Sequence, residues 1–103
     1  MVSFEEMVGV VEGWFLRGKA TDQQKFIDTP FEKLIRYHDS VGRSIRNEFK
    51  LWETHWIPEI KNGADYSPNH PDQISMRIIE EVWTRLRGGN NVIPRLWRSL
   101  YRR

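Results

Sequence analysis

The sequence predicts an all-α protein, a compact bundle of three main helices with additional short helical segments. Apolar residues recur every three or four positions in three stretches, which is the spacing of one buried helix face. Helix start signals precede these stretches, and no stretch alternates apolar with polar residues for long enough to indicate a strand. The chain has 103 residues, 39% hydrophobic and 29% charged, so we expect a single all-helical domain over residues 1–103.

The first helix is expected over residues 4–16. Ser3 and Glu6 form a capping box at its start. Four apolar residues then follow on one helix face: Phe4, Val8, Val11 and Phe15. Gly9 and Gly13 lower the helix propensity of this stretch. They indicate either the close approach of a neighbouring helix or a frayed first helix, and the same face could support a homodimer.

The longest helix is expected from Pro30 to about residue 50. Thr29 is a candidate N-cap with Pro30 at the first helical position, and before it Thr21 is expected to cap a short turn over residues 22–27. The apolar stripe repeats at steps of four and three: Phe31, Ile35, His38, Gly42, Ile45, Phe49 and Trp52. This spacing predicts one continuous helix.

After residue 52 the chain is expected to turn. A short helix should open at Trp56 and end near Gly63, because Trp56 and Ile57 are followed by a proline that suits a first helical turn. A loop is expected over residues 65–69, where proline and asparagine occur. This region should connect the second and third main helices.

The third main helix is expected to begin with Asn69 or His70 as its cap and Pro71 in the first turn. Its buried side should carry Ile74, Ile78, Ile79, Val82 and Leu86. Gly88 and Gly89 are expected to end it. Residues 92–103 should then form a basic C-terminal helical segment.

A glycine and two polar residues stand in the middle of the predicted long helix. Gly42 lies on the apolar stripe, so we expect a neighbouring helix or a tryptophan ring to come close to its backbone. Arg46 and Asn47 are expected to fasten the loop that connects to the third helix. We favour such a structural role over a ligand site for seven residues: His38, Gly42, Arg46, Asn47, Trp52, His70 and Asp72.

Two sequence blocks carry a family resemblance. The run VGRSIRNEFKLW at residues 41–52 and the run HPDQISMRIIEEVW at residues 70–83 resemble a family of small bacterial and phage-associated proteins catalogued only as a domain of unknown function. The resemblance covers residues 31–87 and implies a helical fold without an activity. Lys50 stands where the family pattern has glycine, so the sequence leaves open whether Lys50 prolongs or ends the long helix.

The residue types of common catalytic and metal sites are absent or unsuitably spaced. The chain contains no cysteine, which excludes thiolate nucleophiles and cysteine-bound metals. His38, His55 and His70 are separated by 17 and 15 positions, which matches no metal-ligand motif. We expect no metal, no cofactor and no enzyme activity; a catalytic site would require a pocket around His38, Arg46 and His70.

Basic residues are concentrated at the C-terminal end. Residues 1–76 carry 9 Lys and Arg against 12 Asp and Glu, a net charge of −3, whereas residues 77–103 carry 7 Arg against 2 Glu, a net charge of +5. Arginine and aromatic side chains are frequent anchors of protein interfaces. The candidate partner-binding residues are therefore Trp83, Arg87, Arg95, Trp97, Arg98, Tyr101 and Arg102.

These observations favour a noncatalytic protein-binding module of unknown partner, with an inhibitor or regulator in a bacterial or phage setting as one version. The alternative is a nonspecific nucleic-acid-binding protein, in which the C-terminal arginines contact phosphates while Trp97 and Tyr101 stack on bases. The chain has no signal-peptide pattern and no run of about 20 apolar residues, so we expect a cytoplasmic protein that does not cross a membrane.

Overall fold

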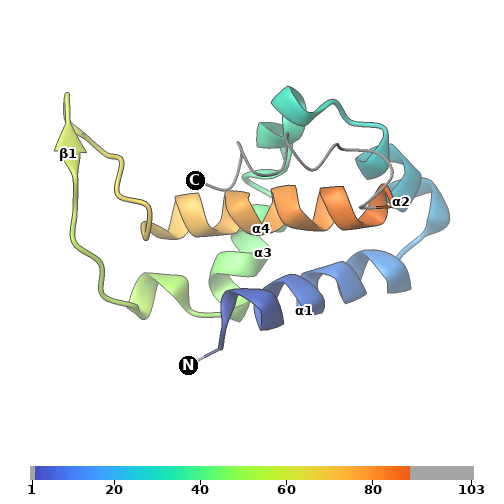
Figure 1. The fold of residues 1–103 in the computed structure, drawn as a ribbon, viewed down its shortest axis with the longest axis horizontal. Helices are drawn as coiled ribbons and strands as arrows, with labels where there is room; N and C mark the ends of the chain where they lie inside the picture. The colour runs from blue at the N-terminus through green and yellow to red at the C-terminus, as the bar shows by residue number, and fades with distance from the viewer. Residues whose placement is uncertain (1, 89–103) are drawn as a thin grey trace.

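The computed structural model describes residues 2–88, which form helices and one small hairpin (Figure 1). The elements in chain order are α1 (Phe4–Arg17), α2 (Ala20–Ile27), the 3₁₀ helix η1 (Phe31–Tyr37), α3 (Val41–Glu48), the 3₁₀ helix η2 (Leu51–Glu53), β1 (Ile60–Lys61), β2 (Ala64–Asp65) and α4 (Pro71–Leu86). The prediction of a mostly helical, compact fold is confirmed. The predicted basic segment over residues 92–103 lies outside the described residues.

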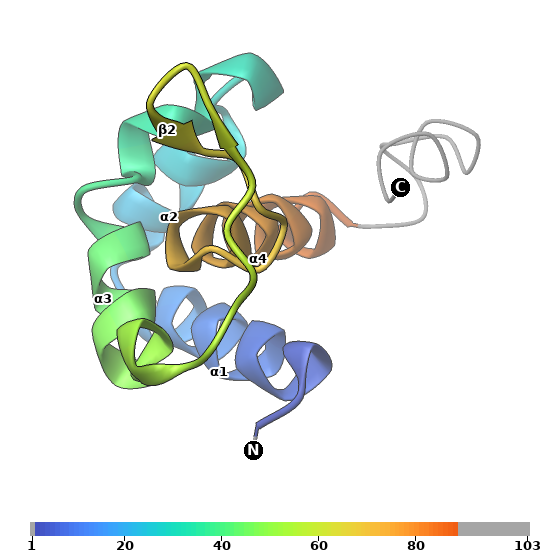
Figure 2. The ribbon, with the colours of Figure 1, turned by 90° about the vertical axis from the view of Figure 1, so that its left-hand side faces the viewer.

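Helix α4 lies at the centre of the fold, with α1 on one side and α2 and η1 on the other (Figures 1 and 2). The helices share one apolar core, whose innermost members are Val8, Val11, Phe26, Leu34, Ile45, Ile78, Ile79 and Val82. Burial of each such side chain contributes roughly 1.5–3 kcal/mol. The face of α4 that was predicted to be buried contains three buried residues, Ile78, Ile79 and Val82, and two partly buried ones, Ile74 and Leu86.

Helix α1 starts at the predicted capping box. Ser3 Oγ accepts a hydrogen bond from the Glu6 N–H at 3.1 Å, and Glu6 Oε1 accepts one from the Ser3 N–H at 3.3 Å. The predicted close approach at the glycines is wrong at Gly9, where an added Cβ would meet nothing within 4 Å among residues 2–88. At Gly13 the neighbouring group is the guanidinium of Arg17 from the same helix. A homodimer through this face stays a prediction.

The two threonines that were predicted as N-caps do not cap a helix. Lys19 occupies the N-cap position of α2, and Pro30 occupies that of η1. The Thr29 hydroxyl instead donates to the carbonyl oxygen of Lys25 at 2.8 Å, at the end of α2. Thr21 lies one residue inside α2.

The predicted long helix is divided into η1 and α3 by a turn at residues 38–40. Ser40 has φ −105° and ψ −85°, outside the helical range. In a continuous α-helix the carbonyl of His38 would accept the N–H of Gly42. Here that carbonyl accepts a hydrogen bond from Arg46 Nη2 at 3.1 Å. The guanidinium thus satisfies a carbonyl that the turn leaves without a helical donor.

The 3₁₀ geometry of η1 changes which residues face the core. In a 3₁₀ helix, residues three positions apart lie on the same side. Phe31, Leu34 and Tyr37 therefore pack on the core, whereas Ile35, which the predicted stripe placed inside, is 61% exposed. The second main helix of the predicted bundle is thus replaced by two short helices.

Lys50 ends the helical segment, which answers the question that the sequence left open. Its backbone has φ 50° and ψ 45°, in the left-handed region, and η2 begins directly after it. A residue with a Cβ is disfavoured there by roughly 1–2 kcal/mol, whereas glycine has no such cost. The side chain of Lys50 is exposed.

Replacing Lys50 by glycine is expected to stabilise the protein by about 0.5–1 kcal/mol, because relief of the left-handed strain exceeds the added entropy of the unfolded chain. Urea unfolding followed by circular dichroism measures this change. Lys33→Gly is the control, since Lys33 is an exposed lysine in η1 without a positive φ. That variant should lose stability. A loss of stability in Lys50→Gly would contradict the strain argument.

The short helix expected between Trp56 and Gly63 is wrong, because this part of the chain forms a hairpin. Strands β1 and β2 pair antiparallel, with Ile60 opposite Asp65. The two residues between them, Asn62 and Gly63, have φ 51° and 80°. An Asn-Gly pair with two positive φ angles is typical of a type I′ turn, which selects a two-residue hairpin.

Helix α4 begins as predicted. His70 is its N-cap, with Nδ1 accepting the N–H of Asp72 at 3.0 Å, and Pro71 occupies the first turn. The helix ends at Leu86, and Gly88 follows with φ 87°, a left-handed conformation that suits glycine at a helix end.

Candidate functional site

The segment from residue 52 to residue 66, which we call the arm, carries four exposed large apolar side chains, including the two most exposed ones of residues 2–88. Figure 1 shows its hairpin at one end of the molecule, beyond the start of α4. Ile57 is 86% exposed, and three further arm residues are more than half exposed: Trp52, Ile60 and Tyr66. Exposed apolar residues that gather in one part of a surface often mark an interaction site.

Asp65 organises the arm from within. Its Oδ2 accepts the indole N–H of Trp56 at 2.9 Å, and its Oδ1 accepts the backbone N–H groups of Glu59 at 3.1 Å and Ser67 at 2.9 Å. The hydrogen bond from Trp56, followed by that from Ser67, lowers the pKa of Asp65 from 3.8 to about 2. The stabilisation that these bonds provide is present above pH 3.8 and is lost as the pH falls towards 2.

His70 connects the arm to α4. Its imidazole ring lies 5.3 Å from the ring of Trp52 and 5.4 Å from that of Trp56, both in edge-to-face arrangements. The two tryptophan rings contact each other at 6.1 Å. Because Nδ1 of His70 also caps α4, one side chain fixes both the helix start and the base of the arm.

Arg46 joins α3 to α4 from a buried position. The residue is only 6% exposed, and its Nη1 donates to Ser75 Oγ at 3.0 Å. Its Nη2 donates to the His38 carbonyl, and its Nε lies 3.6 Å from Asp72 Oδ1. The sequence predicted that Arg46 would hold the loop before α4, but the guanidinium contacts α4 itself.

The glycine at position 42 makes room for this arginine. A Cβ built on Gly42 would lie 2.9 Å from Arg46 Nη1 and 3.3 Å from the carbonyl oxygen of Tyr37. The sequence predicted a neighbouring helix or a tryptophan ring at this point. The nearest group is the arginine side chain of the same helix, and the neighbouring helix α4 is also in contact, with Ile79 Cδ1 at 3.7 Å from that Cβ.

His38 and Asn47 do not fasten the fold through their side chains. His38 contributes its backbone carbonyl, and its ring Nδ1 is buried without a hydrogen-bond partner among residues 2–88. Asn47 is exposed, and within the same residues its side chain has no hydrogen bond. Of the seven predicted fasteners, the side chains of Arg46, Trp52, His70 and Asp72 make the connecting contacts.

Trp83 was predicted to contact a partner, but it lies in the core and is 5% exposed. Its indole N–H donates to the Thr29 carbonyl at 2.9 Å, and its ring packs against Phe31. The guanidinium of Arg87 lies 4.4 Å over the Trp83 ring and donates to the carbonyl of Ile27 at 2.7 Å. Both residues hold α4 against the neighbouring helices, so neither is placed as a partner contact.

The other predicted partner-binding residues, Arg95, Trp97, Arg98, Tyr101 and Arg102, lie outside the described residues. A protein or nucleic-acid contact through that basic segment stays a prediction.

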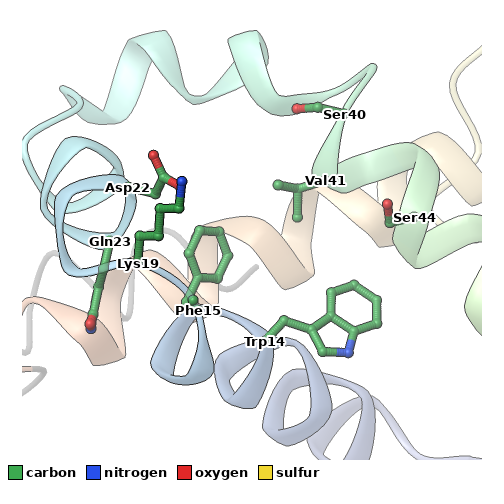
Figure 3. A pocket seen from close by; sticks show the side chains of 9 residues that line it. Trp14, Phe15, Lys19, Asp22, Gln23, Ser40, Val41 and Ser44 are labelled. Carbon is green, nitrogen blue, oxygen red and sulfur yellow. The ribbon is translucent and has the colours of Figure 1, made fainter.

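A second feature is a pocket of about 440 Å³ between α1, α2 and the start of α3 (Figure 3). Its apolar wall consists of Trp14, Phe15 and Val41. Polar side chains stand at two sides of it, Lys19, Asp22 and Gln23 at α2, and Ser40 and Ser44 at α3. No local pattern in the sequence indicates this pocket, because three separate elements form it.

The described part of the chain contains no group of three or more histidine, aspartate or glutamate side chains that could hold a metal ion. In the same residues, none of the helices has the length and apolar character needed to span a bilayer. The pocket lies away from Arg46, whose surroundings are filled by its own hydrogen-bond partners.

Comparison with known proteins gives one match. A family described as "Domain of unknown function (DUF6794)" matches residues 16–86, which include α2, α3, the arm and all of α4. No curated protein and no solved structure matches the chain.

Proposed function

Since the chain belongs to this family, a domain of unknown function, we propose that it is a noncatalytic protein-binding module that engages its partner through the arm. The observation that carries the proposal is the exposure of Ile57, at 86%, on a segment held in a defined conformation. Exposing a large apolar side chain to water has no benefit for the isolated fold. It is favourable when a partner covers that side chain.

The arm is held in shape before any partner binds. Asp65 accepts hydrogen bonds from Trp56 and Glu59 within the arm and from Ser67 directly after it, and the rings of Trp52 and Trp56 pack edge-to-face with His70. Ordering a loop during binding costs free energy, so a segment that is already ordered binds more tightly for the same contacts. Trp52 and Tyr66 are also residue types that are enriched in interfaces.

The charges of the arm indicate the chemistry of the partner. Residues 52–66 contain three acidic residues, Glu53, Glu59 and Asp65, and one basic residue, Lys61. A net negative arm is attracted to a basic protein surface and repelled by anionic lipid or nucleic acid. We infer a protein partner with an apolar cleft and a basic rim, into which the projecting arm inserts as an inhibitor or regulator would.

Photo-crosslinking tests this proposal. A crosslinking amino acid is placed at position 57, and the matched control carries it at position 35, because Ile35 is also an exposed isoleucine but lies on η1. Each variant is exposed to proteins of the native cell, and the crosslinked protein is identified by mass spectrometry. We expect a partner that is captured from position 57 and not from position 35.

The captured partner is then titrated with point variants. Ile57→Ser should weaken binding by about tenfold or more, and Ile35→Ser should not, since truncation of an interface anchor typically costs more than 1.4 kcal/mol. Equal effects of the two variants would refute the proposal. If the chain crosslinks only to its own copies, the arm serves self-association instead of binding a partner protein. If the chain binds lipid vesicles and Ile57→Ser abolishes that binding, the arm contacts a membrane.

A further inference from the structure

The pocket between α1, α2 and α3 combines an apolar wall with two charges of opposite sign at the same side. Lys19 is the N-cap residue of α2, and Asp22 lies in the first turn of that helix. Figure 3 shows both side chains at the α2 side of the pocket, with Phe15 below them. The volume of about 440 Å³ falls within the range of roughly 300–1,000 Å³ that is typical of small-molecule sites.

Both charges are exposed and have no partner among residues 2–88. Lys19 and Asp22 form no ion pair or side-chain hydrogen bond, with each other or with any other residue from 2 to 88. The hydroxyl groups of Ser40 and Ser44, across the pocket, likewise have no hydrogen bond within these residues. The pocket therefore offers an ammonium group and a carboxylate to a ligand, beside an aromatic surface.

The two charges limit the chemistry of the ligand. A ligand with a carboxylate alone would pair with Lys19 but would bring a like charge towards Asp22, and a ligand with an ammonium alone would do the reverse. A purely apolar ligand would pack on Phe15 and make no contact with either charge. A ligand that carries both charges on adjacent atoms and a ring next to them satisfies all three groups.

We propose that this pocket binds a free α-amino acid with an aromatic side chain. The ammonium group of the ligand pairs with Asp22, and its carboxylate pairs with Lys19. Its ring packs on Phe15, Val41 and Trp14. None of the residues that form the pocket belongs to the arm, so the site is independent of the protein-binding surface proposed above.

Isothermal titration calorimetry with four ligands tests each feature separately. Phenylalanine carries all three groups, its methyl ester lacks the carboxylate, N-acetylphenylalanine lacks the ammonium, and alanine lacks the ring. We expect phenylalanine to bind with a Kd of about 1 mM or below, and each of the other ligands to bind about tenfold more weakly, because each loses one charge-assisted or apolar contact.

Two variants test which charged group of the ligand pairs with Lys19 and which pairs with Asp22. Lys19→Gln should remove the preference for phenylalanine over its methyl ester, and Asp22→Asn should remove the preference over N-acetylphenylalanine. Lys25→Gln and Asp28→Asn are the matched controls at exposed positions of the same region, outside the pocket, and should leave both preferences unchanged. Lys19 and Asp22 are also exposed, so all four variants should fold.

The proposal is overturned by any of three results. The first is no heat of binding with phenylalanine at concentrations of about 1 mM and above. The second is equal affinity for phenylalanine and the analogues. The third is a loss of affinity in the controls as large as that in Lys19→Gln or Asp22→Asn.

Discussion

Replacement of Arg46 by alanine is expected to lower the free energy of unfolding by about 3 kcal/mol, the largest effect that we predict for a single polar residue. The variant loses the hydrogen bonds to Ser75 and to the His38 carbonyl, and it leaves a cavity where the buried side chain lay. The partial exposure of Asp72 keeps the loss from being larger, because its carboxylate retains contact with water. Urea unfolding followed by circular dichroism measures the change.

Arg43 provides the matched control for this prediction. It lies on the same helix but is exposed, so Arg43→Ala should change stability by no more than about 0.5 kcal/mol. Gly42→Ala tests the same contact from the other side, since its Cβ would crowd the Arg46 guanidinium. The double variant with Arg46→Ala should show less than additive loss, because the crowded group is then absent. Additive losses would mean that Gly42 and Arg46 are not coupled.

Glu80 gives the second large effect, which depends on pH. Burial raises the pKa of this α4 carboxyl group from 4.5 to about 7, and the nearby Arg77 opposes the shift only in part. The folded protein therefore binds a proton more readily than the unfolded chain between these pH values, and stability falls as the pH rises from 4.5 to 7. Glutamine resembles the protonated acid. Glu80→Gln should stabilise the protein by about 1–2 kcal/mol at about pH 8, after allowance for solvent screening of this partly exposed group.

Chemical denaturation of wild type and Glu80→Gln at several pH values checks this expectation. The difference between the two proteins should be near zero below pH 4.5 and should grow up to pH 7. Glu32→Gln is the control, because Glu32 is exposed on η1. Its difference from wild type should show no such growth. A pH-independent effect of Glu80→Gln would assign its cause to packing rather than to titration.

Local signals in the sequence were sufficient to predict those parts of the structure that depend on residues close together in the chain. The capping box of α1 and the sequence His70-Pro71-Asp72 at the start of α4 each involve atoms only two or three residues apart. The apolar spacing of α4 also identified Ile78, Ile79 and Val82 as core residues. Both long helices could therefore be predicted.

The interruption between η1 and α3 could not be predicted from local spacing. The carbonyl at the turn is satisfied by Arg46, which also donates to Ser75, a residue 29 positions further along the chain. The 4-3-4 stripe of apolar residues continues through the turn, so periodicity alone favours an unbroken helix. The hairpin differs in this respect, since the Asn62-Gly63 pair is a local signal of a two-residue turn, and the helix expected from Trp56 to Gly63 did not take it into account.

The candidate sites depend on burial, which one sequence does not specify. Trp83 and Trp52 are the same residue type, yet Trp83 is covered by Phe31 and Arg87 while Trp52 is half exposed at the base of the arm. Aromatic content alone therefore does not tell which tryptophan lies at the surface. The pocket was not predicted, because Lys19 and Val41 come together only after the chain folds.

Arg46 of α3 contacts Ser75 and Asp72 of α4, and Trp52 contacts His70. These contacts hold the two ends of the arm close together on the helical part of the molecule. The helices are therefore joined without help from the hairpin between them. Doubling the length of such a closed loop costs only about 0.6 kcal/mol. A change in the length of the intervening sequence should therefore have little effect on the stability of the helical part of the molecule.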